Sequence, residues 1–590
     1  MITEQRPPRI VWAAHLLAIL LSLALNLNLR SADQLGFQGD DFSHIGTFLD
    51  SERALRHNWR NLASYVLTDE PLFNLYHGLR YHWLGDNPRR HHLLQGLLLA
   101  ANATLAFALV WRLSRRYLLS FVFLLLFLTY PNRGEACYWL AAIYVPMLLP
   151  LLAAAHLFLS WIESGARRAY IACWLSYSAA IFTHEAAFGF LAVFGGLWWL
   201  KRGSASWRGA ARALTPLALS NAAYLVVRQT QWLGFGEPGF LHDRPLEPAR
   251  VLANFLHVID ANFGDRFLTQ SEHLLRAGSA AQSMVVPFLG VLGVLLAAAW
   301  LAGPAVAWRR RLEGVVLLMA LVGVLALYTG QTPVPDAFLV MRWGLRAVVF
   351  TALGTLILAR ILAAPADAPL LRLGAFGILW FLAAYAPTLV LHVADRHSYI
   401  PSLGLGVTLA CALWLPSSAM RDERRRGLLE GMAVALAAYM GVAFYGTALG
   451  ERTWWVDAAR FVSGLRSQMA RARPSLPPQA RVVVLDVPAV RNSVPLLASY
   501  ALGTALRHWY RAPALPAASE FVARQKDFRF VHSKEPHHYE QLLLFAYKNE
   551  VLTPIGELVF EDGARVRLAT AFGMTGGAWL AVRDGQWVGH

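Results

Sequence analysis

Charged residues are scarce in this sequence. Asp, Glu, Lys and Arg together make up 15% of the 590 residues, whereas hydrophobic residues make up 56%. A soluble domain carries about 25% charged residues. A soluble fold of this composition would lack the polar surface that keeps a protein in solution, so lipid must contact much of the chain. The sequence therefore predicts an integral membrane protein.

Cysteine is also scarce. The three cysteines, Cys137, Cys173 and Cys411, lie in or beside apolar runs and form no C-x-x-C pair, which excludes a disulfide framework and a cysteine zinc site. Internal repeats and low-complexity segments are missing as well. The first apolar run, Val11 to Leu27, follows a basic start but precedes no small-residue cleavage site. We expect a retained first helix and not a removed signal peptide.

Acidic residues are fewer than basic ones: 37 Asp and Glu stand against 53 Lys and Arg, which gives a formal net charge of +16. The Lys and Arg residues form short clusters between apolar runs, and they are not interleaved with aromatic residues along a stripe. This pattern follows the positive-inside rule of membrane proteins. It predicts membrane lipids as partners and argues against nucleic acid.

Apolar runs dominate the first 450 residues. A membrane helix needs about 20 apolar residues, and this criterion predicts about thirteen spans. Their positions are 10–28, 92–111, 117–130, 138–160, 169–183, 186–200, 211–228, 282–302, 313–329, 346–363, 373–391, 399–415 and 428–448.

The connections between these spans predict the orientation. Every second connection is short and basic, beginning with the one that holds Arg112, Arg115 and Arg116. The other set includes the long stretches 29–91 and 229–281. An N-terminus inside and an odd number of spans place the C-terminal tail outside. We therefore expect a multi-pass protein of the cytoplasmic (inner) membrane whose long loops face outward.

The tail, residues 451–590, has a different pattern. It predicts an amphipathic helix from Glu451 to Ala472, a buried strand from Arg481 to Val487, a helix from Val494 to Trp509, and β-rich pieces near 527–532, 551–560 and 564–584. The fold class is thus an α-helical polytopic membrane domain, 1–450, followed by a small extracytoplasmic α+β domain, 451–590.

Carboxylates gather on the predicted outer side. Asp40 and Asp41 are adjacent in the first outer loop, and like charges raise one pKa toward the range of a general base; the alternative is an exposed helix cap. Glu135 lies in the short second outer turn, where it can approach the pair. His184 and Glu185 lie between two apolar runs, where ionisable residues usually mark function; a helix cap is again the alternative.

Two arginines complete the outer set. Arg342 and Arg396 lie in later outer connections, and arginine suits phosphate because it can donate two parallel hydrogen bonds. Pairing with Asp395 or a lipid headgroup is the alternative for Arg396. Six histidines between His44 and His92 leave a metal site open, since metal binding requires several of them to converge.

Short motifs follow one another in a fixed order along residues 30–460. They are Gly39-Asp40-Asp41, Glu70-Pro71-Leu72, Gly85 with Asn87-Pro88 and His92, Pro131 with Glu135-Ala136 and Trp139, His184-Glu185-Ala186, Arg396 with Tyr399 and Pro401-Ser402-Leu403-Gly404, and Trp454-Trp455 with Asp457. In this order they resemble the membrane part of the GT-C glycosyltransferases. The resemblance is closest to the protein O-mannosyltransferases and the membrane-anchored mannosyltransferases that carry tetratricopeptide repeats.

The resemblance implies a polyprenyl phosphate sugar as donor, used outside the cytoplasmic membrane with inversion at the anomeric carbon. It makes Asp40 the general base, Asp41 its partner and Glu135 the second-loop carboxylate. His184, Glu185, Arg342 and Arg396 would border the donor phosphate. The need for a divalent cation differs among GT-C branches. Two departures are Glu70, where the family more often has Arg, and His184, where Lys is common.

Two other classes of function remain as alternatives. A transporter or flippase of lipid-linked glycans would have a similar composition, but such proteins tend to show related halves and charged sites at the bilayer midplane. A scaffold whose outer domain binds a partner would need no converging carboxylates. The sequence does not identify the sugar, or whether the acceptor is a protein, a lipid or a glycan.

Overall fold

The structure is a computed structural model, and two compact units make up the chain. Unit 1 comprises Met1–Leu29, Leu94–Cys137 and Ala142–Glu451, and unit 2 comprises Arg30–Leu93, Tyr138–Ala141 and Arg452–His590. The structure describes residues 8–42, 44–45, 70–130, 133–202, 207–234, 251, 254–255, 258, 369–389, 394–418, 420, 422–476, 480–485, 487, 490–491, 494–496, 501–511, 520–522, 541–548, 551–554, 557–559, 565–567, 580–583 and 586–589.

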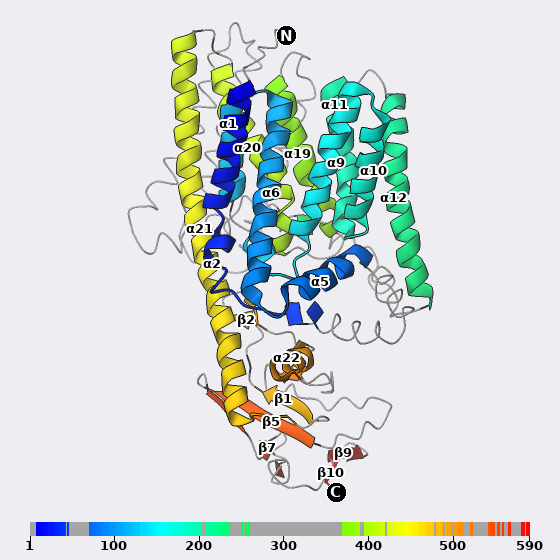
Figure 1. Cartoon of the computed structure of the whole chain (residues 1–590), viewed down its shortest axis with the longest axis vertical. Coiled ribbons are helices and arrows are strands. Elements are labelled where there is room, and N and C mark those ends of the chain that lie inside the picture. The colour runs from blue at the N-terminus through cyan, green and yellow to red at the C-terminus, as the bar shows by residue number, and fades with distance from the viewer. Residues whose placement is uncertain are drawn as a thin grey trace, which may run out of the picture. The chain divides into compact units, whose positions relative to one another are not determined.

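Unit 1 is helical (Figure 1). Helix α9 packs against α10, and α19 packs against both α11 and α20. The elements are α1 (Pro8–Ala24), α2 (Leu27–Ser31), α6 (Pro88–Ser114), α7 (Tyr117–Thr129), α8 (Gly134–Tyr138), α9 (Tyr144–Ser164), α10 (Arg167–Ile181), η1 (Glu185–Gly189), α11 (Phe190–Arg202), α12 (Trp207–Gly234), α19 (Pro369–Leu389), η2 (Asp395–Ser398), α20 (Pro401–Ser418) and α21 (Glu423–Ala472).

Six helical stretches of the described residues are long and apolar enough to cross a membrane. They are Arg9–Ser31, Pro88–Ser114, Tyr144–Ser164, Arg208–Val227, Pro369–Leu389 and Glu423–Ala472. Several carry large apolar side chains that the protein leaves exposed, such as Trp12, Leu219 and Val442, and lipid is the environment that suits them. The protein is therefore a helical multi-pass membrane protein. The predicted spans 282–302, 313–329 and 346–363 lie outside the described residues, so the count of thirteen stays a prediction.

Two predicted helix boundaries are wrong. The span predicted from residue 138 begins at Tyr144, in α9, because residues 139–141 are not helical and belong to unit 2. The separate helix predicted from Glu451 is instead the continuation of α21, which runs unbroken to Ala472. Glycines in a helix cost only about 1 kcal/mol each, whereas proline breaks it, and Gly446 and Gly450 are not followed by proline within α21.

Helices α19 and α20 pack at backbone distance. A Cβ atom on Gly377 would come within 2.6 Å of the carbonyl oxygen of Gly404, and one on Gly404 would collide with the carbonyl of Gly377. Small residues let membrane helices approach this closely. The contact fixes the two helices that flank η2, and η2 carries Arg396.

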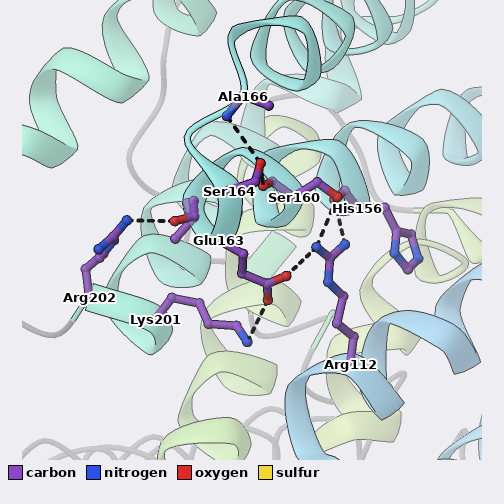
Figure 2. A network of polar contacts seen from close by, with 9 residues as sticks. Arg112, His156, Ser160, Glu163, Ser164, Ala166, Lys201 and Arg202 are labelled. Carbon is purple, nitrogen blue, oxygen red and sulfur yellow. Dashed lines mark hydrogen bonds and ion pairs between the residues drawn. The ribbon is translucent and has the colours of Figure 1, made fainter.

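A polar network ties three helix ends together in unit 1 (Figure 2). The carboxylate of Glu163, near the end of α9, pairs with Arg112 of α6 at 2.6 Å and with Lys201 of α11 at 3.1 Å. Helix α9 has 21 residues and is therefore about 30 Å long. The network lies at the opposite end of α9 from Tyr144. Three of the connections that sequence predicts to be cytoplasmic thus meet at one end of unit 1.

Glu163→Gln is expected to destabilise the protein. Arg112 and Lys201 would lose their shared counter-charge while their side chains are only 18% and 25% exposed, a loss of about 1–2 kcal/mol. Thermal unfolding of the purified protein in detergent measures this as a lower Tm. The matched control is Asp422→Asn, because Asp422 and Arg425 form a pair with side chains 55% and 77% exposed. Equal Tm values for the two variants would contradict the expected contribution of the Glu163 ion pairs to stability.

Unit 2 contains α5 (Pro71–Leu84), α22 (Ala501–Tyr510) and ten short strands, all counts referring to the described residues. A four-stranded sheet has the order β4-β1-β5-β6, in which β1 pairs in parallel with β4 and β5 and β6 is antiparallel to β5. The strand predicted from Arg481 is present as β1 (Ala480–Leu485), with Val482 and Val484 buried. The remaining strands are β2 (Val490–Arg491), β3 (Val494–Pro495), β4 (Glu520–Val522), β5 (Gln541–Lys548), β6 (Val551–Pro554), β7 (Glu557–Val559), β8 (Arg565–Arg567), β9 (Leu580–Arg583) and β10 (Gln586–Gly589).

The helix predicted from Val494 is wrong in its first residues. Val494 and Pro495 form β3, which pairs with β2, and the helix α22 begins at Ala501. Proline lacks the N–H that a helix interior needs. The predicted strand at 527–532 lies outside the described residues.

Candidate active site

The turn that carries Asp40 and Asp41 is anchored in unit 2 by two tryptophans. Gly39 has φ +50°, a left-handed conformation that glycine adopts without strain. The indole Nε1 of Trp139 donates to the carbonyl of Gln38 at 3.3 Å, and the Gln38 side chain donates to the carbonyl of Trp455 at 2.8 Å. Three separate motifs of the sequence therefore meet at this turn.

The two aspartates differ in their surroundings. Asp40 is partly exposed, whereas Asp41 is only 4% exposed. The backbone N–H of Gln38 donates to Oδ2 of Asp41 at 2.9 Å. Burial raises the pKa of Asp41 to about 7, although the Gln38 N–H and the charge of Arg80 act to lower it. Asp41 is therefore not the exposed helix cap that was the alternative, and near neutral pH it is poised between its two protonation states.

Helix α5 supplies two residues beside Asp41. One is Arg80, which lies in no sequence motif, and the other is His77, one of the six histidines between His44 and His92. Phe73, His77 and Arg80 lie on its buried face. The guanidinium of Arg80 donates to the carbonyls of Leu140 at 3.2 Å and His91 at 3.0 Å. Their spacing of four and three residues is the repeat of one helical face. That spacing was the sequence signal for a buried polar pair, because it places His77 and Arg80 on the same helix face as the apolar Phe73.

Histidines pack together near this aspartate. The rings of His44 and His77 stack with centroids 4.8 Å apart and planes inclined by 20°. Burial lowers the pKa of His44 to about 4 and that of His77 well below its ordinary value. Both imidazoles are therefore neutral at physiological pH, and each offers one donor and one acceptor nitrogen.

In unit 1, Glu135 and Arg396 form an ion pair. The backbone N–H of Arg396 donates to Oε2 of Glu135 at 3.0 Å, and the guanidinium of Arg396 pairs with Oε1. The two residues are 261 positions apart in the sequence, and their side chains are 16% and 22% exposed. One carboxylate thus fixes both the backbone and the charged group of Arg396.

The connection around Arg396 is itself held in place. The hydroxyl of Tyr385 donates to Oγ of Ser398 at 2.7 Å, and the N–H of Ala394 donates to Nδ1 of His397 at 2.9 Å. These bonds fix both sides of η2. The position of the guanidinium is therefore determined by the fold and not by a mobile side chain alone.

A tyrosine connects two histidines at the same end of unit 1. The ring of Tyr144 lies 5.5 Å from that of His184 and 5.4 Å from that of His397. The Nδ1 atom of His184 accepts from the N–H of Ala186 at 3.0 Å, so His184 does cap η1, as the alternative interpretation held. In both rings Nδ1 accepts a hydrogen bond, so the ring proton is on Nε2, which is a donor.

The structure also positions Glu185. Its Oε2 atom accepts from the hydroxyl of Tyr224 at 3.3 Å and lies 4.0 Å from Nδ1 of His184. Of the predicted site residues, Glu135, His184, Glu185 and Arg396 belong to unit 1, and Asp40 and Asp41 belong to unit 2. That Glu135 approaches the aspartates stays a prediction. Arg342 lies outside the described residues.

No protein-family model matches the chain, and no curated protein matches it. Among solved structures, it aligns with the crystal structure of ArnT from Cupriavidus metallidurans in the apo state. The alignment covers 98% of this chain and 98% of that chain, with 13% identity and a TM-score of 0.38. A likeness at that level does not indicate function.

Proposed function

We propose that the protein is an inverting glycosyltransferase of the GT-C type, acting at the outer face of the cytoplasmic membrane. It moves a sugar from a polyprenyl-phosphate donor to an acceptor hydroxyl. The motifs between Gly39 and Asp457 that resemble this group support the proposal, and so does the helical membrane fold.

The observation that carries the proposal is the ion pair of Glu135 and Arg396. Two connections far apart in the sequence converge so that a carboxylate orients a partly accessible guanidinium. A guanidinium in a fixed orientation can bind a phosphate through two parallel hydrogen bonds and stabilise it as a leaving group. His184 and His397, as Nε2 donors, are suited to the remaining phosphate oxygens.

In the proposed reaction Asp40 removes the proton from the acceptor hydroxyl. The acceptor oxygen then bonds to the anomeric carbon, while the bond from that carbon to the donor phosphate oxygen breaks and its electron pair stays with the phosphate. Attack from the face opposite the phosphate inverts the anomeric carbon. Asp41 is the partner of this base. Glu135 acts through Arg396 and is therefore a positioning residue in this scheme.

The direct test is sugar transfer by the purified protein in lipid nanodiscs. Polyprenyl phosphates carrying different radiolabelled sugars, mannose first, are offered with total envelope protein, lipid and glycan fractions as acceptors. We expect label to pass from at least one donor to one fraction. Parallel reactions with a chelator and with added divalent cation determine whether a metal is needed. Movement of intact donor across the bilayer without transfer would instead identify a flippase.

A further inference from the structure

A small polar cavity in unit 2 adjoins Asp41. The residues that line it are Phe37, Asp41, His44, Ile45, His77, Arg80, Tyr81, His91 and Leu140. It offers about 20 Å³ to the centres of water molecules. This is room for water but not for a sugar ring. The polar lining of a cavity of this size requires water or protein hydrogen-bond partners.

Three buried atoms of these lining residues have no hydrogen-bond partner among the described residues. They are Oδ1 of Asp41, Nε2 of His77 and Nε of Arg80. Their residues are 4%, 9% and 3% exposed. Buried polar atoms are nearly always satisfied, by water where protein offers no partner. One water in this cavity would find an acceptor on Asp41, a donor on Arg80 and either function on His77, which is the number of partners a buried water usually has.

The position of Asp40 makes the cavity relevant to the proposed reaction. Asp40 is partly exposed and can meet an acceptor, whereas Asp41 is buried. The backbone N–H of His44 donates to the carbonyl of Asp40 at 3.0 Å, and the charge of Asp40 acts on the imidazole of His44. His44 also lines the cavity and stacks on His77. Asp40 is therefore one helical turn from a residue that lines the cavity.

We propose that Asp41 is the proton acceptor that resets Asp40, and that water in this cavity carries the proton between them. The proposal rests on the proposed glycosyl transfer. After Asp40 has taken the acceptor proton, it gives that proton to a cavity water. The water passes one of its own protons to Oδ1 of Asp41. Asp40 is again a carboxylate, Asp41 is a carboxylic acid, and Asp41 loses its proton to solvent before the next turnover.

The surroundings of Asp41 suit it to hold a proton for part of each cycle. Burial and, to a smaller extent, the charge of Asp40 favour the neutral acid. The Gln38 N–H, the positive charge of Arg80 and the backbone of Ala141 favour the carboxylate, and the resulting pKa is about 7. The other titratable groups that face the cavity are His44, His77, Tyr81 and His91. Below pH 7 Asp41 already holds a proton and cannot accept another. The transfer rate should therefore fall as the pH drops through 7.

The test compares the full-length wild type with Asp41→Asn and with Asp33→Asn. Asp33 is the matched control, because its side chain is 71% exposed and pairs only with Arg89 among the described residues. Infrared spectroscopy during a pH titration detects the carbonyl stretch of a protonated carboxyl. We expect a band that titrates near pH 7 in the wild type and in Asp33→Asn and that is missing in Asp41→Asn.

Kinetics form the second arm of the test. In Asp41→Asn we expect kcat to fall about tenfold, KM to stay unchanged and the acidic limb near pH 7 to disappear, while Asp33→Asn keeps the wild-type profile. An acidic limb that persists in Asp41→Asn overturns the relay, and so does the absence of the infrared band. If the band is present but the wild type transfers no sugar from any donor, the proposed glycosyl transfer is wrong. The proton relay, which depends on that reaction, is then rejected as well.

Discussion

Replacement of Asp40 by asparagine is expected to lower kcat of sugar transfer by roughly 10²–10⁴-fold. The amide has nearly the shape of the carboxylate but cannot take the proton of the acceptor hydroxyl. Because Asp40 is partly exposed on a turn held by Gly39 and Trp139, the substitution should leave the fold intact. Initial rates with saturating donor measure the effect.

The control for this prediction is again Asp33→Asn, which removes an exposed carboxylate from the same connection, residues 29–91. We expect wild-type kcat for this variant. A small primary amine or formate added to Asp40→Gly tests the role directly, since an external base of the right kind should restore part of the lost rate. Transfer by Asp40→Asn at the wild-type rate would exclude Asp40 as the base.

The membrane class of the fold follows from the sequence because composition and hydropathy are properties of whole segments. Runs such as Tyr144 to Ser164 must avoid water wherever they lie in three dimensions. The ends of the helices depend on tertiary contacts instead. Residues 139–141 are as apolar as the helix that follows, yet Trp139 leaves the helical path and donates to Gln38, which periodicity cannot indicate.

The candidate site was also predictable only in part, because charge patterns indicate which segments lie together but not which side chains meet. The sequence predicts that Glu135 and Arg396 share one membrane face, and the structure pairs them. A contact between residues 261 positions apart has no local signal in the sequence. Arg80 was not selected because it lies in none of the recognised motifs, although its helix begins at the motif Glu70-Pro71-Leu72. Its importance follows from burial beside Asp41, which only the assembled structure provides.

Arg396→Ala is expected to lower kcat by roughly 10²–10³-fold, because in the proposed reaction the donor phosphate would lose the cation that stabilises it as it departs. Arg396→Lys keeps a charge but not the planar fork, so it should restore only part of the rate. Glu135→Gln keeps an acceptor for the Arg396 backbone N–H but loses the ion pair, and we expect a smaller loss of about tenfold. Arg89→Ala, in an exposed pair, should have wild-type kcat.

The combination of the two substitutions decides how Glu135 acts. If it works only by orienting Arg396, then Glu135→Gln should cost nothing more in protein that already carries Arg396→Ala, because the group that it orients is gone. If the two losses multiply, Glu135 contributes independently of Arg396, and its role is then that of a catalytic carboxylate in direct contact with substrate. The wild type, Glu135→Gln, Arg396→Ala and the double variant are assayed for kcat and for donor KM. If Glu135 is a positioning residue, Glu135→Gln changes both parameters in the wild-type background. In the Arg396→Ala background it then changes neither.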